Sequence, residues 1–394
     1  MSAFHTRLLA LLLLPFLLFA LCPAGSGDFA APVWCETAGA VPDLPDLPAL
    51  APPRLSAKSY ILTAPDAGLV LAEQAADEKR PMASTTKIMT ALVVLGLCPL
   101  DAVVTVPEEA VGVEGSSMYL YAGETLTVEA LLFGLLLSSA NDAATALALF
   151  AAGSMTAFAD RMNEKAAVLG LSGTHFVNPH GLDDPDHYTT ARDLATLAAA
   201  ALKNETFARI VSTRTYSVPQ NGTGATRYFR NHNRLLRTYP GAVGVKTGYT
   251  KKSGRCLVSA AVREGLLLIA VTLDDPADWQ DHKTLYDAAF AAYTALPAPP
   301  FSLSLPVTGG RQENVNLSGA AIPFALIPKD AEVTWRLEAP RFLYAGFAAG
   351  TPAGALILTV DGKEALRLPL STETGVKKAK KPSLWQRIKA AFTR

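Results

Sequence analysis

Residues 80–90 read RPMASTTKIMT and place Ser84 three positions before Lys87. Pro81 favours a helix start, and apolar residues recur with helical spacing over residues 88–97. Ser84 and Lys87 are therefore expected to share one face at a helix N-terminus. A serine hydroxyl needs a base to remove its proton, and lysine can be that base only when it is neutral. A Ser-x-x-Lys spacing alone arises by chance, so its meaning depends on the rest of the chain.

A second motif, Ser139-Ala140-Asn141, follows an apolar stretch that predicts a helix over residues 128–137. The amide of Asn141 can both donate to and accept from a bound peptide, and the hydroxyl of Ser139 can pass on a proton. A purely structural alternative is that Ser139 is the N-cap of the next helix, predicted over residues 142–151.

A third motif, Lys246-Thr247-Gly248, precedes a hairpin pattern and is expected at a sheet edge. Lys246 and Thr247 can bind a carboxylate, and Gly248 permits a substrate backbone to approach the strand closely. Lys246 also lowers the pKa of Lys87 if the fold brings them together. The structural alternative is an ordinary turn with a solvated lysine. The three motifs in this order indicate serine acyl-transfer chemistry with a lysine base.

The expected elements run from strands to helices and back to strands, which predicts an α+β domain with an antiparallel sheet. The expected strands are 59–63, 68–71, 256–262 and 266–273, and the expected helices are those above together with 191–202 and 281–296. Five segments are predicted along the chain: a signal peptide (1–24), a Pro-rich lead-in (25–53), a peptidase domain (54–296), a small all-β domain (297–375) and a basic amphipathic helix (376–394).

The two chain ends predict export and membrane attachment. Arg7 followed by the apolar run 8–21 is typical of a signal peptide; a lipoprotein signal at Cys22 is disfavoured by the bulky Leu21. Residues 383–394 place apolar side chains on one helix face beside several cations, as in helices that lie on anionic membranes. A tail that docks on its own protein or stays disordered is the alternative.

Composition excludes several classes of function. The chain has 35 basic and 35 acidic residues among 394, which argues against nucleic acid as a partner. No cysteine or histidine spacing predicts a metal site, and no cofactor is expected. Cys35, Cys98 and Cys256 remain after signal cleavage, and an odd number allows at most one disulfide. Buried thiols are the expected state.

Histidine and aspartate side chains between residues 178 and 187 offer alternative sites. His180 as a general base is disfavoured against a loop histidine held by a neighbouring carboxylate. A metal site is disfavoured against a solvated loop with crowded acidic residues; its members would be Asp183, Asp184, Asp186 and His187.

Over about residues 57–293, the chain closely resembles the D-alanyl-D-alanine carboxypeptidases, low-molecular-mass penicillin-binding proteins of serine peptidase family S11. The resemblance extends more loosely through the β-domain. The matching stretches are residues 80–90, 115–120, 138–143, 178–183, 187–195 and 244–250. A mild departure is Ala140, where the family often has glycine.

The resemblance implies an α+β, penicillin-binding/transpeptidase-like catalytic domain, related to serine β-lactamases, on the outer face of the bacterial cytoplasmic membrane. It implies peptidoglycan stem peptides as substrates and β-lactams as inhibitors. The implied catalytic roles are nucleophile for Ser84, base for Lys87 and proton transfer for Ser139. The N–H groups of Ser84 and Tyr249 would form the oxyanion hole. The substrate would be bound by Asn141, Lys246, Thr247 and Gly248.

Two other functions stay open at this point. A serine β-lactamase shares the three motifs, but the Glu-x-x-x-Asn loop of class A enzymes is not evident. A catalytically idle wall-binding protein has no chemical reason to retain all three motifs.

Overall fold

The computed structural model describes residues 50, 54–220, 225–296, 303–319, 325–380 and 385. The predicted signal peptide, nearly all of the Pro-rich lead-in and Cys35 lie outside the described residues, as do residues 381–384 and 386–394 of the predicted C-terminal helix. These segments and the predicted domain boundaries stay predictions. Residues 376–380 of the predicted helix are not helical, because Val376 and Lys378 form β-bridges with Phe347 and Gly310. Cys98 and Cys256, the two cysteines that the structure describes, are free thiols; Cys256 is buried as expected, whereas Cys98 is only partly buried.

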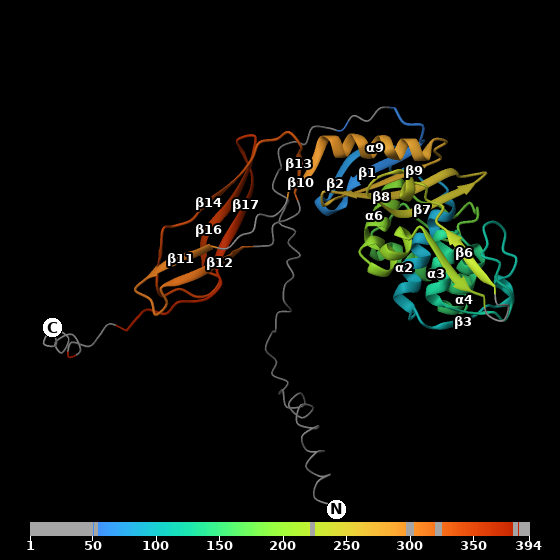
Figure 1. Cartoon of the computed structure of the whole chain (residues 1–394), viewed down its shortest axis with the longest axis horizontal. Helices are drawn as coiled ribbons and strands as arrows, with labels where there is room; N and C mark the ends of the chain where they lie inside the picture. Colours follow the sequence, from blue (N-terminus) through green and yellow to red (C-terminus); the bar gives the residue numbers. More distant parts are fainter. Residues whose placement is uncertain are drawn as a thin grey trace, which may run out of the picture. The chain divides into compact units, whose positions relative to one another are not determined.

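The catalytic motifs lie in a part of the chain built around a five-stranded antiparallel sheet (Figure 1). Its strand order is β2-β1-β9-β8-β7. The strands are β1 (Ser59–Ala64), β2 (Leu69–Gln74), β7 (Ala242–Thr250), β8 (Gly254–Arg263) and β9 (Leu266–Leu273). Residues far apart in sequence pair directly, as Ile61 does with Val271. The expected antiparallel sheet is thus confirmed, with the third motif on its edge strand β7.

Helices cover both faces of this sheet because its strands bury side chains on both sides. Ile61 and Val258 lie in one core, packed with residues of α2, α3, α4 and α6. Their sequence neighbours Leu62 and Leu257 lie in a second core with Leu285 of α9. Figure 1 shows α9 on the side of the sheet opposite α2, α3, α4 and α6, whereas Leu235 of α8 lies in the same core as Leu285 of α9. The helices are α2 (Lys87–Leu97), α3 (Val128–Leu137), α4 (Asn141–Ala152), α5 (Met155–Val168), α6 (Ala191–Leu202), α7 (Glu205–Ser212), α8 (Leu235–Thr238) and α9 (Asp278–Ala292).

One sequence-based expectation, for residues 293–296, and the structural alternative for Ser139 are wrong. The helix predicted over 281–296 ends at Ala292, and β10 (Tyr293–Leu296) is a strand paired with β13 (Ala325–Pro328). A partner strand about thirty residues away supplies the backbone hydrogen bonds of β10, which local pattern cannot reveal. Ser139 is not a helix N-cap: α4 begins at Asn141, and Ala140 occupies the cap position.

Several smaller elements had not been expected. A two-stranded hairpin joins β5 (Thr215–Pro219) to β6 (Thr226–Arg230), and a second pairs β3 (Val103–Thr105) with β4 (Thr125–Thr127). Short 3₁₀ turns are η1 (Pro65–Ala67), η2 (Ala83–Thr86) and η3 (Glu108–Ala110).

The described residues from 303 onward form mainly strands, as the alternating sequence pattern predicts. A six-stranded sheet has the order β14-β16-β17-β12-β11-β15. Leucines that alternate along β17, among them Leu366 and Leu368, build its own apolar core. The strands are β11 (Leu303–Thr308), β12 (Asn314–Gly319), β14 (Val333–Glu338), β15 (Leu343–Tyr344), β16 (Pro352–Val360) and β17 (Lys363–Thr372).

Within the described part of the chain, no single helix has the length and apolar character needed to cross a membrane. Helices α4 and α5 meet that requirement only as a pair bent by 85°.

Candidate active site

Ser84 lies in the 3₁₀ turn η2, directly before α2. The preceding residue, Ala83, has φ +45°, a left-handed conformation that is unfavourable for a residue with a Cβ atom. Ser139 shares this property with φ +61°. Such residues persist only where surrounding contacts enforce them, and they concentrate at functional sites. Two serines of the predicted site are thus presented by strained backbone.

Lys87 begins α2, where its ammonium group is completely buried beside Ser84. Its Nζ lies 2.8 Å from Ser84 Oγ, 2.6 Å from Asn141 Oδ1 and 2.6 Å from the carbonyl oxygen of His180. Burial and the charge of Lys246 hold the pKa of Lys87 well below its usual value, although Asp142 opposes this. A neutral lysine at this position has two N–H groups and one lone pair.

The two carbonyl partners decide where that lone pair points. Asn141 Oδ1 and His180 O can only accept hydrogen bonds, so they bind the two N–H groups of neutral Lys87. The lone pair is then left for the third neighbour, the hydroxyl of Ser84. This arrangement can take the proton of Ser84 as it attacks.

The loop of residues 178–183 supplies His180 O and depends on a glycine. Gly181 has φ +87°, and a Cβ atom there would lie 2.0 Å from the carbonyl oxygen of Ala83. Its N–H donates to Asn178 Oδ1 at 2.7 Å, and Thr90 Oγ1 donates to the carbonyl of Pro179 at 2.6 Å. Only glycine lets this loop pack against the Ser84 turn so closely.

Asn141 is held by the loop that contains Ser116. Its backbone N–H donates to Ser116 O at 2.7 Å, and its Nδ2 donates to the carbonyl of Glu114. The next residue, Asp142, is buried and accepts hydrogen bonds from the hydroxyl of Ser117 at 2.6 Å and from the backbone N–H of Met118 at 3.1 Å. This part of the site was missed from sequence, although Asp142 directly follows the second motif.

Lys246 of β7 extends to the second motif rather than into the open pocket. It is buried, and its Nζ donates to Ser139 Oγ at 3.0 Å and to Thr247 O at 2.8 Å. Burial lowers the pKa of Lys246 to about 7. Lys87 and Ser139 share no hydrogen bond among the described contacts, so Ser139 contacts the second lysine of the site.

A pocket of about 320 Å³ opens above these buried groups. Five residues of the predicted site line it: Ser84, Ser139, Thr247, Gly248 and Tyr249. A Cβ atom at Gly248 would lie 3.0 Å from the backbone nitrogen of Ser84, so β7 packs directly against the nucleophile turn. This brings the strand that carries Tyr249 beside the N–H group of Ser84, as an oxyanion hole requires.

Five further residues line the pocket and were not singled out from sequence: Ser116, His232, Arg255, Asp278 and Trp279. Arg255 on β8 is the cross-strand partner of Tyr249, and it is exposed. A recognisable signal existed for Arg255, because it lies just after the third motif at the start of a predicted strand. His232 and Asp278 come from a loop and a helix start that no motif marks.

The alternative histidine sites serve structure in this fold. The ring of His180 accepts from the backbone N–H of Leu182 at 3.3 Å, whereas the sequence predicts a carboxylate partner. His187 Nε2 lies 2.7 Å from Thr86 Oγ1 and its Nδ1 accepts from the N–H of Val177 at 3.0 Å. Burial lowers the pKa of His187 to about 4 and that of His180 to about 3. No group of three or more His, Cys, Asp or Glu side chains suited to a metal ion occurs among the residues that the structure describes.

Comparisons with known proteins agree with this geometry. The S11 peptidase family model, described as D-alanyl-D-alanine carboxypeptidase, matches residues 48–277. The D-alanyl-D-alanine carboxypeptidase DacF of Bacillus subtilis is 33% identical over 338 residues, which cover 82% of this chain and 86% of that protein. The D-alanyl-D-alanine carboxypeptidase of Streptomyces sp. strain K15 is 40% identical over 243 residues, covering 57% of this chain and 84% of that protein.

Solved structures show the same likeness. Penicillin binding protein 5 from Haemophilus influenzae matches with a TM-score of 0.66 at 29% identity, over 84% of this chain and 100% of that one. The carboxypeptidase DacD from Francisella tularensis has a TM-score of 0.63 at 25% identity, over 88% of this chain and all of the other. The chain therefore belongs to the S11 family of serine peptidases, the D-alanyl-D-alanine carboxypeptidases, and has their penicillin-binding protein fold.

Proposed function

We propose that this protein removes the terminal D-alanine from peptides that end in D-Ala-D-Ala, by way of an acyl-enzyme on Ser84. The observation that carries the proposal is the buried Lys87 amine, 2.8 Å from Ser84 Oγ and with a strongly lowered pKa. Membership of the carboxypeptidase family supports the same reaction. Peptidoglycan stem peptides are the proposed natural substrates.

In acylation, Ser84 Oγ attacks the carbonyl between the two D-alanines while its proton moves to the lone pair of Lys87. The backbone N–H groups of Ser84 and Tyr249 stabilise the resulting oxyanion. The intermediate then expels D-alanine, whose amine takes up the proton of Ser139. Ser139 regains a proton from the ammonium group of Lys87, so Lys87 becomes neutral and the proton lost by Ser84 leaves with the amine. Because Lys246 donates to Ser139 Oγ, that hydroxyl is free to point its own hydrogen toward the leaving nitrogen.

In deacylation, a water molecule takes the place of the departed D-alanine. Lys87, neutral again, accepts a proton from this water as it attacks the ester. Collapse of the second oxyanion breaks the bond to Ser84 Oγ, which takes back a proton and releases the shortened peptide. Asn141 acts in both steps by holding Lys87 in place and, with its remaining N–H, by binding the peptide.

The direct test measures D-alanine released from an N-acylated peptide ending in D-Ala-D-Ala, together with the site of covalent modification. We expect release by the full chain. Incubation with a labelled penicillin should attach one label to the proteolytic fragment that contains Ser84. No release by folded protein, or a label on another residue, would contradict the proposal.

Arg255 is expected to bind the terminal carboxylate together with Thr247. Lys246 is buried and donates to Ser139 Oγ and Thr247 O, whereas the exposed guanidinium of Arg255 borders the pocket. A hydrogen bond to a charged group contributes about 1.5–3 kcal/mol, so Arg255→Ala should raise KM about 10- to 100-fold with little change in kcat. For a substrate with a C-terminal amide, which has no carboxylate to bind, Arg255→Ala should raise KM far less. Equal losses on the free acid and the amide would rule out this contact.

The pH profile of acylation tests the coupling of the two lysines. The base form of Lys87 is required, so the acylation rate should rise with pH as Lys87 loses its proton. Lys246→Gln removes a positive charge that lowers the pKa of Lys87. The acid limb of the profile should therefore move upward, by about one pH unit for a close pair in a partly shielded site. If the acid limb of the Lys246→Gln profile lies at the same pH as that of the wild type, whatever the absolute rate, the charge of Lys246 does not affect the pKa of Lys87.

Neither alternative function gains support from a specific observation. The matched family model and the relatives reported above are D-alanyl-D-alanine carboxypeptidases rather than β-lactamases. An idle wall-binding protein would not require the buried lysine next to Ser84. Acylation by β-lactams is proposed for this chain because a named structural relative is a penicillin-binding protein.

Export and membrane attachment remain proposals that rest on the sequence of the two chain ends. The run of residues 8–21 supports export, and the cations and apolar residues of 376–394 support a helix on the outer face of the cytoplasmic membrane. Loss of membrane co-sedimentation on removing residues 376–394, with D-alanine release retained, is the expected outcome.

A further inference from the structure

Four arginines gather on the surface beside the active-site pocket. They are Arg214, Arg230, Arg234 and Arg237, here called the arginine cluster, and all four are exposed. The buried Asn231 links two of them: its backbone N–H donates to Arg214 O at 2.9 Å, and its carbonyl accepts from the side-chain Nη1 of Arg237 at 3.2 Å. The cluster is therefore built on a fixed local framework.

The positive charges of the cluster are only partly balanced within the described part of the chain, where the charge of Arg234 acts on the carboxyl group of Asp278. Ion pairs there involve other arginines, such as Arg192 with Glu73 and Arg209 with Glu129, but none of the four. Burial and the charges of Arg230, Arg214 and Arg234 lower the pKa of Arg237, which is the effect expected of cations held close together. Such a concentration is notable in a chain whose formal net charge is zero.

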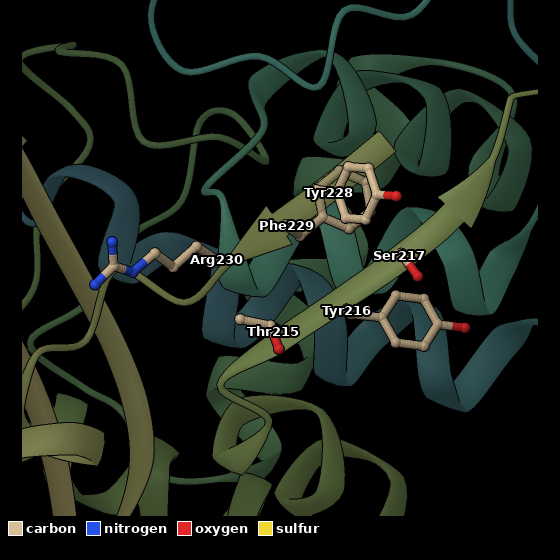
Figure 2. Close-up of a pocket in the computed structure, with 6 residues that line it drawn as sticks. All are labelled: Thr215, Tyr216, Ser217, Tyr228, Phe229 and Arg230. Carbon is tan, nitrogen blue, oxygen red and sulfur yellow. The ribbon is translucent and has the colours of Figure 1, made fainter. Parts of the chain in front are cut away.

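The cluster adjoins a hollow of about 430 Å³ on the β5–β6 hairpin (Figure 2). Arg230 and Thr215 are cross-strand partners, as are Tyr228 and Ser217, and all four line the hollow. Tyr228 is 81% exposed. The hollow thus offers a guanidinium, hydroxyl groups and an aromatic ring on one surface, which suits a polar chain with negative charges.

The hairpin below this surface is firmly anchored. Arg227, the neighbour of Tyr228, is buried and forms an ion pair with Glu124. It also donates to the carbonyls of Met118 and Tyr119, both at 2.9 Å. Phe133 stacks on Tyr216 from the inner side, with ring centroids 3.5 Å apart. A surface held in this way can bind a ligand without a large ordering cost.

The arginine cluster is continuous with the catalytic pocket. His232, which lines the pocket, lies in sequence between Arg230 and Arg234. The charge of Arg234 also acts on Asp278, another pocket-lining residue. A peptide bound at Ser84 therefore has a positively charged surface beside it.

We propose that the arginine cluster and the outer face of the β5–β6 hairpin bind the carboxylates of an acidic peptide whose D-Ala-D-Ala end occupies the pocket. This inference rests on the proposed function and extends it: the preferred substrate carries several negative charges besides its terminal carboxylate. Continuity with a peptide-binding pocket favours an acidic peptide over a membrane surface, and so does the hollowed, hydroxyl-lined shape of the hairpin face.

The test compares two peptides with the same D-Ala-D-Ala end, one without other charges and one with three glutamates nearer its N-terminus. At low salt, the full chain should have a kcat/KM about tenfold higher for the acidic peptide, and this advantage should shrink as NaCl is added. The double variant Arg230→Gln/Arg237→Gln should lose the advantage and keep the rate on the uncharged peptide. The control variant Arg161→Gln/Arg367→Gln, which removes two exposed and paired arginines, should behave like the wild type.

The outcomes separate the two proposals. No release from the uncharged peptide by the wild type would contradict the proposed function itself. Normal release from it, with an acidic-peptide advantage that is absent or that survives in Arg230→Gln/Arg237→Gln, would overturn the inference alone. A third arm measures binding to vesicles of anionic phospholipid. If the double variant loses vesicle binding but keeps its preference for the acidic peptide, the cluster is a membrane contact and the inference is wrong.

Discussion

Replacing Lys87 with arginine or methionine is expected to slow the acylation of Ser84 by about three orders of magnitude. General-base catalysis of this kind contributes roughly 10²–10⁴-fold, and the arginine remains protonated at every accessible pH. Methionine is close to lysine in shape but has no lone pair of comparable basicity. Both variants leave the Ser84 hydroxyl in place without a base.

The measurement is the second-order rate of labelling by a fluorescent penicillin, with circular dichroism and denaturant unfolding to verify the fold. Lys203→Met changes an exposed lysine of the same domain and should label at the wild-type rate. A folded Lys87→Met protein that labels within tenfold of the wild type would show that another group is the base.

Replacing Gly181 with alanine is expected to damage both stability and catalysis. The new Cβ would lie 2.0 Å from Ala83 O and 2.9 Å from Thr86 Oγ1, at a φ of +87°. Backbone strain alone costs about 1–3 kcal/mol, and relief of the clash requires the 178–183 loop to move. The movement withdraws His180 O from Lys87 Nζ, so acylation should fall by about 100-fold or more even in the folded fraction.

Gly170→Ala is the matched control, because Gly170 also has a positive φ (+73°) but a Cβ there meets no atom within 4 Å. It should cost only the backbone strain and leave acylation unchanged. Denaturant unfolding curves measure the stability of both variants, and the rate of penicillin labelling measures their acylation. Equal behaviour of the two glycine variants would mean that contact with Ala83 does not hold the loop in place.

Local pattern predicted much of the fold correctly. The helices α3 and α6 and the strand β9 have the bounds that their sequences predict. Thr127 and Thr190 cap the two helices through their side chains, and such caps are visible in the sequence. The strand β10 was mistaken for helix because its hydrogen bonds go to β13, and no local signal reports a distant partner.

The candidate site likewise contains residues that the sequence could identify and residues that only the fold brings to it. Motif spacing sufficed to select Ser84, Lys87, Asn141 and Lys246, and the structure brings these residues together. Spacing could not select His180, because its contribution is a backbone carbonyl that any residue could offer. For Arg255 the sequence offered only its position beside a predicted strand, and its place at the pocket follows from strand register. The roles of all these residues stay predictions until they are tested.

The sequence by itself determined which chemical groups are present, since a nucleophile, two amines and an amide are properties of residue type and order. Only the tertiary structure decided their state. The proton affinity of Lys87 depends on its removal from water and on its proximity to Lys246. The direction of its lone pair depends on two carbonyls from separate segments of the chain. Desolvation and orientation are properties of what packs around a group, and that is settled only when the chain has folded.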